Sequence, residues 1–319
     1  MALRKRLHIR SKSQQNTGFG SNAASYGGRF ISKNGYANVR KSGVGFFDSI
    51  SWYHTMLNIP RWKFMFIILL FYFLVNCFFA ALYLFIGIEH LDGARVYTPW
   101  DKFGQAFFFS IQTLTTVGYG HISPTGFFAS MVAAVEALFG LLSFAIATGL
   151  FYGRFSMPKA HILFSKEALI APYKENQKAL MIRLTPYKNA NLTDVEARFT
   201  LGIQAQESRG SSNQFYNLEL ELDKINSLNL SWTLVHPITI DSPLYEFTEQ
   251  DYAGIKGELI VFIKAFDDMF SNTVVKRTSY TFDEFVYGAK FEPMFSRNED
   301  NTKTILHIDK LNAYQKVEL

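Results

Sequence analysis

The sequence TTVGYG at Thr115–Gly120 decides how the chain is interpreted, because of what stands on either side of it. Before it, Lys102–Leu114 is apolar and helix-like but only half as long as a membrane span requires. We expect Asp101 to be its N-cap. After it, Phe127–Gly153 is a stretch of 27 residues with one charge, Glu136. A half-depth helix followed by irregular backbone is tolerated in a bilayer only where it is buried in protein or lines a water-filled path, so this pattern predicts a pore.

A second apolar run precedes the half-depth helix. Phe64–Ile86 contains 23 residues without a charge, and like the run after the helix it exceeds the roughly 20 apolar residues that cross a hydrocarbon core. The average composition of the 319-residue chain hides these runs, since only 48% of all residues are hydrophobic. A wholly soluble protein is therefore excluded, and we expect two membrane spans.

Charge is distributed as unevenly as hydropathy. Residues 1–63 carry a net charge of +10, residues 64–153 carry −2, and residues 154–319 carry −3. By the positive-inside rule the N-terminus is cytoplasmic, and two spans return the C-terminal half to the cytoplasm of a cell-membrane protein. The loop that begins at Gly87 then faces outside. It must hold its shape without an intrachain disulfide, because the only cysteine, Cys77, lies in the first span.

After Pro158 the hydrophobic pattern changes to short, alternating segments rich in β-branched and aromatic residues, separated by turn-like stretches such as Glu207–Asn213. Such spacing is typical of a β-sandwich, and we expect one of the immunoglobulin-like kind. The expected strands are Ala179–Leu184, Val195–Ile203, Phe215–Leu222, Leu228–Val235, Glu258–Phe266, Val274–Phe282 and Thr304–Ile308.

The predicted organisation is that of a membrane α + β protein with four parts. Residues 46–58 place apolar side chains at helical spacing and are too short to span, which favours a helix lying in the membrane interface, although an amphipathic segment packed on protein has the same pattern. The parts are a flexible basic arm (1–45), the interfacial slide helix (46–58), a pore domain (59–157, with spans about 62–86 and 127–155, pore helix 102–114 and filter 115–120) and a cytoplasmic β-sandwich (158–319).

The filter segment suits a dehydrated potassium ion. Rings of backbone carbonyls replace the ion's water if successive residues turn their carbonyls to one axis, and glycine at alternate positions, here Gly118 and Gly120, permits such a backbone. We expect carbonyls of Thr116, Val117, Gly118 and Tyr119, with the Thr116 hydroxyl, to form these rings. One chain supplies a quarter of each ring, so a homotetramer is required. A TVGYG sequence in an ordinary turn is the alternative, and the flanking helices disfavour it.

Other chemistry finds little support in the sequence. The seven histidines are scattered without metal-ligand spacing, and neither a nucleotide-binding loop with GK[ST] nor HExxH is present. We therefore expect no enzyme activity, no cofactor beyond permeant K⁺ and no nucleic-acid partner. The basic N-terminal residues are most simply a solvated arm.

With these features in place, the chain resembles inward-rectifier potassium channels, particularly their prokaryotic members. The resemblance runs from about Gly28 to Phe295. Besides TTVGYG it rests on RFISKNGYANV (Arg29–Val39), RWK (Arg61–Lys63), FYGRFSMPKAHILFS (Phe151–Ser165), SWTLVHPI (Ser231–Ile238), DSPLY (Asp241–Tyr245) and SYTFDEFVYGAKFEPMF (Ser279–Phe295).

The resemblance implies a cavity and a gate in the second span. Phe144, Thr148 and Tyr152 are four apart and share one helix face, which lines the cavity in the family. Tyr152 matches the bundle-crossing constriction, and an aromatic packed between helices is its plainer interpretation. Strong rectifiers place an acid where this chain has Phe144, so we expect weak rectification.

Two residues are expected behind the filter. Glu136 is the sole ionisable residue well inside the second span, where we expect it to bond to the pore helix, take part in gating or simply support the structure. Eukaryotic relatives brace the filter with a glutamate–arginine pair, for which this chain has Gln112 and Ile122. Neutral hydrogen bonds and packing must then hold the filter.

The family also suggests a lipid contact and an acidic vestibule. Arg61, Lys63, Arg154 and Lys159 are expected at the cytoplasmic membrane face, as contacts for anionic lipid or phosphoinositide or as plain topological anchors. In the cytoplasmic domain, three acids would concentrate cations in an inner vestibule if they are not ordinary surface charges: Asp267, Asp268 and Glu284.

These observations predict a homotetrameric, potassium-selective channel of inward-rectifier type, gated at the helix bundle and modulated by the β-domain. A weakly selective cation channel is one alternative. A membrane-anchored sensory or binding protein with a non-conducting pore is the other.

Overall fold

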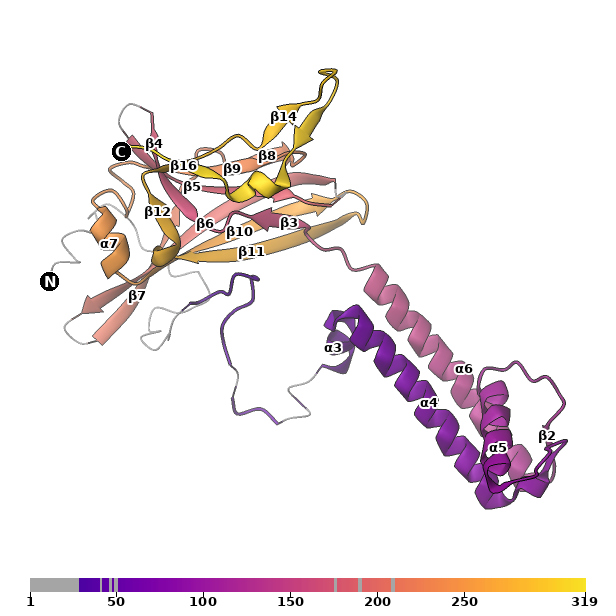
Figure 1. The fold of residues 1–319 in the computed structure, drawn as a ribbon. Helices are drawn as coiled ribbons and strands as arrows, with labels where there is room; N and C mark the ends of the chain where they lie inside the picture. Colours follow the sequence, from indigo (N-terminus) through magenta and orange to yellow (C-terminus); the bar gives the residue numbers. More distant parts are fainter. Residues whose placement is uncertain are drawn as a thin grey trace. The chain divides into compact units, whose positions relative to one another are not determined.

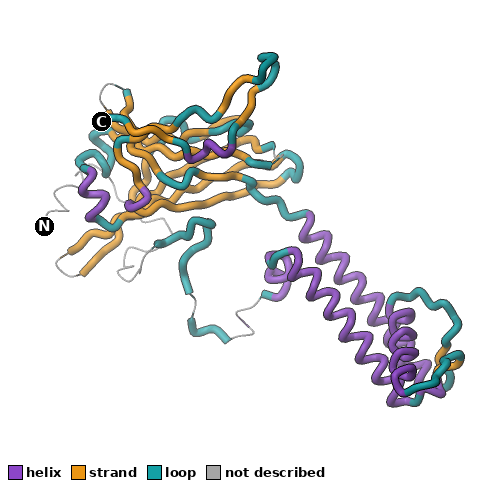
Figure 2. The backbone as a smooth tube through the Cα atoms, viewed as in Figure 1, coloured by secondary structure: helices purple, strands orange, loops and turns teal. Residues whose placement is uncertain are grey.

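A computed structural model describes residues 29–40, 42–45, 48, 51–174, 177–188, 191–207 and 210–319. The chain divides into two compact units, Ser42–Met157 and a unit that combines Met1–Lys41 with Pro158–Leu319 (Figure 1). The first unit is helical and the second is built of strands (Figure 2).

The helical unit holds two long apolar helices and a shorter one between them. The long helices, α4 and α6, are long and apolar enough to cross a membrane. Its elements are α3 (Trp52–Asn58), α4 (Arg61–Ile86), η1 (Ile88–His90), β1 (Leu91–Asp92), α5 (Pro99–Leu114), β2 (Ser123–Pro124) and α6 (Phe127–Phe155). The bounds of α4 and α6 agree with the predicted spans to within one residue.

Helix α5 begins three residues before the predicted start, and the expectation of Asp101 as its N-cap is wrong. Thr98 is the N-cap, and its hydroxyl accepts a hydrogen bond from the Asp101 N–H at 3.2 Å. Asp101 occupies the third helical position and accepts from the Thr98 N–H at 2.8 Å, which completes a capping box. Pro99 at the first helical position favours this start, because its missing N–H has no partner to lose there.

The last seven residues of the predicted slide helix are helical, and its place in the membrane interface stays a prediction. Helix α3 is present, with Leu57 buried and Trp52 and Tyr53 more than half exposed. Phe46, Phe47, Ser49 and Ile50, which opened the predicted segment, lie outside the described residues. One apolar residue is therefore packed and the aromatic ones remain available to an interface.

The β-unit contains two five-stranded sheets that enclose one core. One sheet has the order β11-β10-β6-β7 with β8 on β6, and the other has β12-β4-β5-β3 with β9 on β5. The larger strands are β4 (Ala168–Tyr173), β5 (Gln177–Pro186), β6 (Leu192–Glu207), β7 (Gly210–Leu218), β9 (Trp232–Ile238), β10 (Gly257–Asp267) and β11 (Asn272–Thr281). The smaller elements are β3 (Ile162–Phe164), β8 (Lys224–Ser227), α7 (Glu249–Gly254), η2 (Phe282–Glu284), β12 (Phe285–Tyr287), β13 (Ala289–Phe291), β14 (Phe295–Arg297), β15 (Thr304–Leu306), η3 (Ile308–Asn312) and β16 (Tyr314–Lys316).

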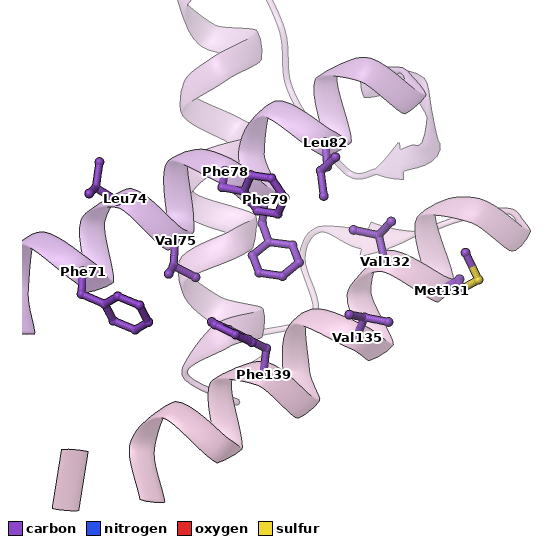
Figure 3. Close-up of a pocket in the computed structure, with 10 residues that line it drawn as sticks. All are labelled: Phe71, Leu74, Val75, Phe78, Phe79, Leu82, Met131, Val132, Val135 and Phe139. Atoms are coloured by element: carbon purple, nitrogen blue, oxygen red, sulfur yellow. The ribbon is translucent and has the colours of Figure 1, made fainter. Parts of the chain in front are cut away.

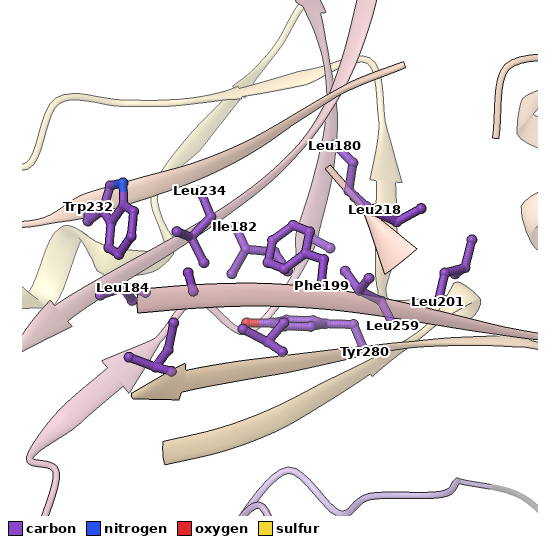
Figure 4. Close-up of a cluster of buried hydrophobic side chains, with 14 of the residues drawn as sticks. Leu180, Ile182, Leu184, Phe199, Leu201, Leu218, Trp232, Leu234, Leu259 and Tyr280 are labelled. Atoms are coloured by element: carbon purple, nitrogen blue, oxygen red, sulfur yellow. The ribbon is translucent and has the colours of Figure 1, made fainter. Parts of the chain in front are cut away.

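Inward-facing side chains of both sheets form the core of this sandwich (Figure 4). Ile182 and Leu184 of β5 and Phe199 of β6 are fully buried there. The Tyr280 hydroxyl, from β11, donates a hydrogen bond to the Ser165 carbonyl at 2.6 Å. This bond gives a buried phenol its polar partner and joins β11 to the segment between β3 and β4.

The turn predicted at Glu207–Asn213 is shorter than expected. Glu207 pairs with Gly210 and Gln204 with Asn213 in the antiparallel hairpin of β6 and β7. The polar composition of this stretch suits an exposed hairpin end as well as a loop, which is why the sequence did not distinguish them.

Residues 29–38, placed by the sequence in a flexible arm, are packed on the β-unit. Phe30 and Ile31 are buried, and the buried Glu258 carboxylate accepts from both of their backbone N–H groups, with Ile31 at 3.0 Å. The Ser279 hydroxyl donates to the Ile31 carbonyl. This segment is therefore an ordered part of the β-unit.

We predict that the β-unit loses stability in mild acid through His236. Its ring is buried, with Nδ1 donating to the Glu219 carbonyl at 2.6 Å and Nε2 bonded to the Ser242 hydroxyl at 2.8 Å. Burial lowers the pKa of His236 below its ordinary value near 6.5. The unfolded chain thus binds the proton first, so stability is fully present above about pH 6.5 and falls as pH drops toward the lowered folded pKa.

The measurement is the thermal unfolding midpoint of the full-length protein between pH 8 and pH 5. His236→Gln should flatten the fall below pH 6.5. His161→Gln is the matched control: burial also lowers the pKa of His161, but its side chain is less enclosed, so its removal should flatten the curve less. Equal curves for wild-type and His236→Gln would contradict this assignment.

Candidate functional site: a filter at the end of a half-depth helix

Residues with a positive φ alternate with residues without one along the predicted filter. Thr116, Gly118 and Gly120 have φ of 58°, 53° and 80°, in the left-handed region. Val117 and Tyr119, between them, are not among the positive-φ residues. Alternation of this kind turns successive carbonyls toward the same side, as the two glycines led us to expect. A positive φ was not expected at Thr116. The signal for it was the position of Thr116 two residues before Gly118, in the same two-residue period as the glycines.

The end of α5 is held to the filter by backbone hydrogen bonds. The Gln112 carbonyl accepts from the N–H of Val117 at 3.0 Å and of Gly118 at 3.3 Å, and the Thr113 carbonyl accepts from Thr116 at 3.0 Å. These bonds satisfy carbonyls that would otherwise be free at a helix C-terminus. Gln112 thus supports the filter through its main chain.

The filter lies uncovered in a single chain. Val117 is 54% exposed and Tyr119 is 76% exposed, although both are apolar enough to be buried in most proteins. A carbonyl ring needs ligands on all sides of the ion, and one chain supplies one side. A single chain therefore leaves the predicted filter open on its other sides.

Packing braces the segment after the filter. Ile122 is 4% exposed in a cluster with Phe79, Tyr83 and Phe109. Strand β1 pairs with β2, which sets Leu91 opposite Pro124. This pairing holds the segment that follows α4 to the segment that follows the predicted filter, without a disulfide.

A buried polar network joins α5 to both long helices. The Tyr83 hydroxyl donates to Oε2 of Glu136 at 2.6 Å, and Ser110 Oγ bonds to Oε1 of Glu136. Ser110 Oγ also lies 3.1 Å from Oδ1 of Asn76. Asn76, Ser110 and Glu136 are 0% exposed. Glu136 therefore bonds to the pore helix, as one of the three roles expected for it requires.

A close approach of α6 to the end of α5 occurs at Gly140. A Cβ atom at this position would lie 2.0 Å from the Leu114 carbonyl oxygen. Only glycine permits the two backbones to come so near, and Leu114 is the last residue of α5 before the filter.

The proposed cavity face of α6 is exposed in the single chain. Phe144 and Tyr152 are each 74% exposed, and the Thr148 hydroxyl bonds to the Phe144 carbonyl at 2.8 Å. None of these three residues is buried by the part of the chain that the structure describes, as a cavity shared between copies would require. Their gating role stays a prediction.

A different space, between α4 and α6, is wholly apolar (Figure 3). It has a volume of about 500 Å³ and is lined by side chains such as Phe71, Phe79, Met131 and Phe139. It offers no polar ligand to a cation. An ion path within one chain is therefore not provided by this space.

Three of the four basic residues expected at the membrane face are exposed, and the fourth, Arg154, is partly buried. Arg61, Lys63 and Lys159 are exposed. The guanidinium of Arg154 donates to the carbonyls of Met56 at 2.9 Å, Leu57 at 3.3 Å and Ile59, close to the end of α3. Arg154 therefore ties α6 to α3, and lipid contact for all four residues stays a prediction.

We predict that Arg154→Gln lowers the free energy of unfolding of the full-length protein by about 1–2 kcal/mol, because a charged donor to several carbonyls is lost. Arg61→Gln, at an exposed position, should change stability by less than about 0.5 kcal/mol. Unfolding in neutral lipid measures both, so that anionic lipid contributes to neither. Equal effects of the two substitutions would show that the hydrogen bonds from Arg154 to the end of α3 do not stabilise the protein.

The three acids expected in a vestibule have different partners. Asp267 is buried, and its Oδ1 accepts from the N–H of Met269 at 3.0 Å and of Phe270 at 3.3 Å. Asp268 is exposed and accepts from the Thr193 hydroxyl at 2.8 Å.

Glu284 is paired with Arg29 and, at 3.2 Å, with Lys33. Two cations already offset its charge, whereas Asp268 has no such ion pair among the described residues. The vestibule remains a prediction, and Asp268 is its most accessible acid.

Comparison with known proteins identifies the family. Residues 162–319 match the family model of the inward rectifier potassium channel C-terminal domain, and residues 67–156 match that of an ion channel. The inward rectifier potassium channel Kirbac3.1 of Paramagnetospirillum magnetotacticum is 30% identical over 281 residues, which cover 87% of this chain and 92% of that channel. The chain belongs to the inward-rectifier potassium channel family. Membership confirms the resemblance found in the sequence, and it accounts for the two spans, the pore segment and the β-sandwich together.

Inward-rectifier relatives from animals are similar over comparable shares of the chain. The inward rectifier potassium channel irk-1 of Caenorhabditis elegans is 24% identical over 86% of this chain, and the G protein-activated inward rectifier potassium channel 1 of Bos taurus is 27% identical over 85%. The matches cover 54% and 58% of those longer channels. Among solved structures, the sporulation control protein Spo0M of Bacillus subtilis is similar over 39% of this chain and 49% of its own, with 7% identity and a TM-score of 0.22, too low to support an argument.

Proposed function

We propose that four copies of this inward-rectifier channel surround one axis and conduct potassium selectively through carbonyls of Thr116–Gly120. The observation that carries the proposal is the alternating left-handed backbone at Thr116, Gly118 and Gly120, beside uncovered Val117 and Tyr119. An alternating backbone presents a column of carbonyls, and four columns enclose an ion. The ion exchanges water oxygens for carbonyl oxygens and moves down its gradient.

The gate is proposed at the inner end of α6. Four copies of Tyr152 would narrow the path, and a ring of large apolar or aromatic side chains closes a pore when water leaves it. Phe144 presents no charge to the cavity, so block by internal magnesium or polyamines is weak and rectification is mild. The segment Asp268–Thr273, which contains the turn between β10 and β11, is a second constriction in this proposal.

The chain is oriented with both termini in the cytoplasm, where the basic residues preceding α4 face an anionic leaflet. Arg61, Lys63 and Lys159 are its proposed contacts with anionic lipid or phosphoinositide. Arg154, already bonded to α3, would act on the same surface through the position of that helix.

Rubidium uptake into proteoliposomes, with sodium as competitor, tests this function. The proposal predicts uptake that excess sodium does not reduce and that depends on an outward potassium gradient. Equal uptake of both ions would favour a weakly selective channel. No uptake by protein that runs as a tetramer would favour a sensory protein with a non-conducting pore.

A further inference from the structure

The polar network behind the filter allows its hydrogens to be counted. Asn76 is oriented by its amide nitrogen, which donates to the Tyr72 carbonyl at 2.8 Å. Its oxygen Oδ1 therefore faces Ser110 Oγ, 3.1 Å away, and can only accept. The orientation of the amide follows from a backbone carbonyl, which cannot donate.

Ser110 consequently stands between two oxygens. Oδ1 of Asn76 is on one side, and Oε1 of Glu136 is on the other. A serine hydroxyl has one hydrogen to donate, and an ionised carboxylate has none. With Glu136 ionised, one of the two contacts would set oxygen against oxygen without a hydrogen, in a site closed to water.

A proton on Oε1 of Glu136 supplies the missing hydrogen, so that both contacts of Ser110 Oγ become hydrogen bonds. The carboxylic acid then donates to Ser110 Oγ, the Ser110 hydroxyl donates to Oδ1 of Asn76, and the Tyr83 hydroxyl donates to Oε2, the carbonyl oxygen of the acid. Each hydroxyl hydrogen of the network then has an acceptor. Apart from Glu136 itself, no Asp, Glu, Lys or Arg side chain takes part in a described contact of this network.

We propose that Glu136 is a neutral carboxylic acid, and that it positions the pore helix by relaying one directed chain of hydrogen bonds from Tyr83 through Ser110 to Asn76. Tyr83 and Asn76 belong to α4, Ser110 to α5 and Glu136 to α6, so the relay ties all three helices together. Ser110 lies two residues before Gln112, whose carbonyl holds the filter. The expected effect of this network on conduction rests on the proposed function of the filter. The proton on Glu136 rests on the hydrogen count alone.

Infrared spectroscopy of the full-length channel in lipid tests the proton directly. We expect a carbonyl stretch of a protonated carboxyl at neutral pH that Glu136→Gln removes. Tyr83→Phe should shift the same band to higher frequency, because it frees the carbonyl oxygen from its donor. If wild-type protein shows no band that responds to either substitution, the proposal is overturned.

Rubidium uptake separates this role from mere packing. Glutamine is neutral, and its amide donates to Ser110 while its oxygen accepts from Tyr83, so Glu136→Gln should keep uptake within about twofold of wild-type. Glu136→Leu has similar bulk and no hydrogen bonds, and should lose uptake at least tenfold. Equal losses in the two variants would overturn the relay. Should wild-type protein conduct nothing, the proposed function fails while the infrared result still decides the proton.

Discussion

Replacing Gly118 by alanine is expected to reduce rubidium uptake to the background of empty liposomes. The φ of 53° at Gly118 costs an L-residue about 1–2 kcal/mol, and in the proposed tetramer the cost recurs in each of four subunits of one ring. Relaxation of this strain turns the peptide between Val117 and Gly118, which moves a carbonyl off the ion path. The site then lacks ligands at one level of the filter.

Gly104→Ala is the control for this substitution. Gly104 lies in α5, and a Cβ there has no atom within 4 Å. Alanine also favours a helix over glycine. Uptake should therefore remain near wild-type. Wild-type uptake by the Gly118→Ala channel would show that the alternating backbone is not the conducting element.

Gly140→Ala is expected to lower uptake at least tenfold for a different reason. The new Cβ would stand 2.0 Å from the Leu114 oxygen and 2.8 Å from the Leu114 carbon, both backbone atoms that cannot turn away as a side chain does. The end of α5 must move, and with it the Gln112 carbonyl that anchors Val117 and Gly118. Overpacking of this kind costs about 1–3 kcal/mol, so we expect the protein to fold with a displaced filter.

Gly149→Ala is the matched control, since Gly149 lies in the same helix and a Cβ there meets no atom within 4 Å. Uptake and thermal unfolding of both variants give the comparison. If Gly140→Ala conducts as well as Gly149→Ala does, the contact between α6 and the end of α5 does not control the filter.

The membrane half of the fold was predictable because its signals are strong and local. Length and hydropathy alone place α4 and α6, and the glycine spacing of TTVGYG anticipates the backbone at Gly118 and Gly120. The start of α5 is harder to predict, because Asp101 has the side chain of an N-cap residue. The N-cap is instead Thr98, which forms a capping box with Asp101 and is followed by Pro99.

The β-sandwich was predictable as a class and less so in its parts. Long strands rich in apolar and β-branched residues, such as β10 and β11, were found. Strand β4 was missed because its first four residues are all buried and therefore do not alternate. Short strands such as β12 and β13 exist through pairing with distant segments, a property that local sequence does not carry.

Tertiary contacts decide what the candidate residues do. Glu136 stood out in the sequence as an intramembrane acid, but its partners Tyr83 and Ser110 come from two other helices. Likewise, no local pattern shows that Glu284 is paired with Arg29, 255 residues away.

The reversal potential of the purified channel in a planar bilayer, with potassium on one side and sodium on the other, tests the central claim most directly. A filter of Thr116–Gly120 carbonyls predicts a large reversal potential, negative on the potassium side, and loss of that selectivity or of all current in Gly118→Ala. A reversal potential near zero in wild-type protein, with current present, would contradict a potassium-selective filter.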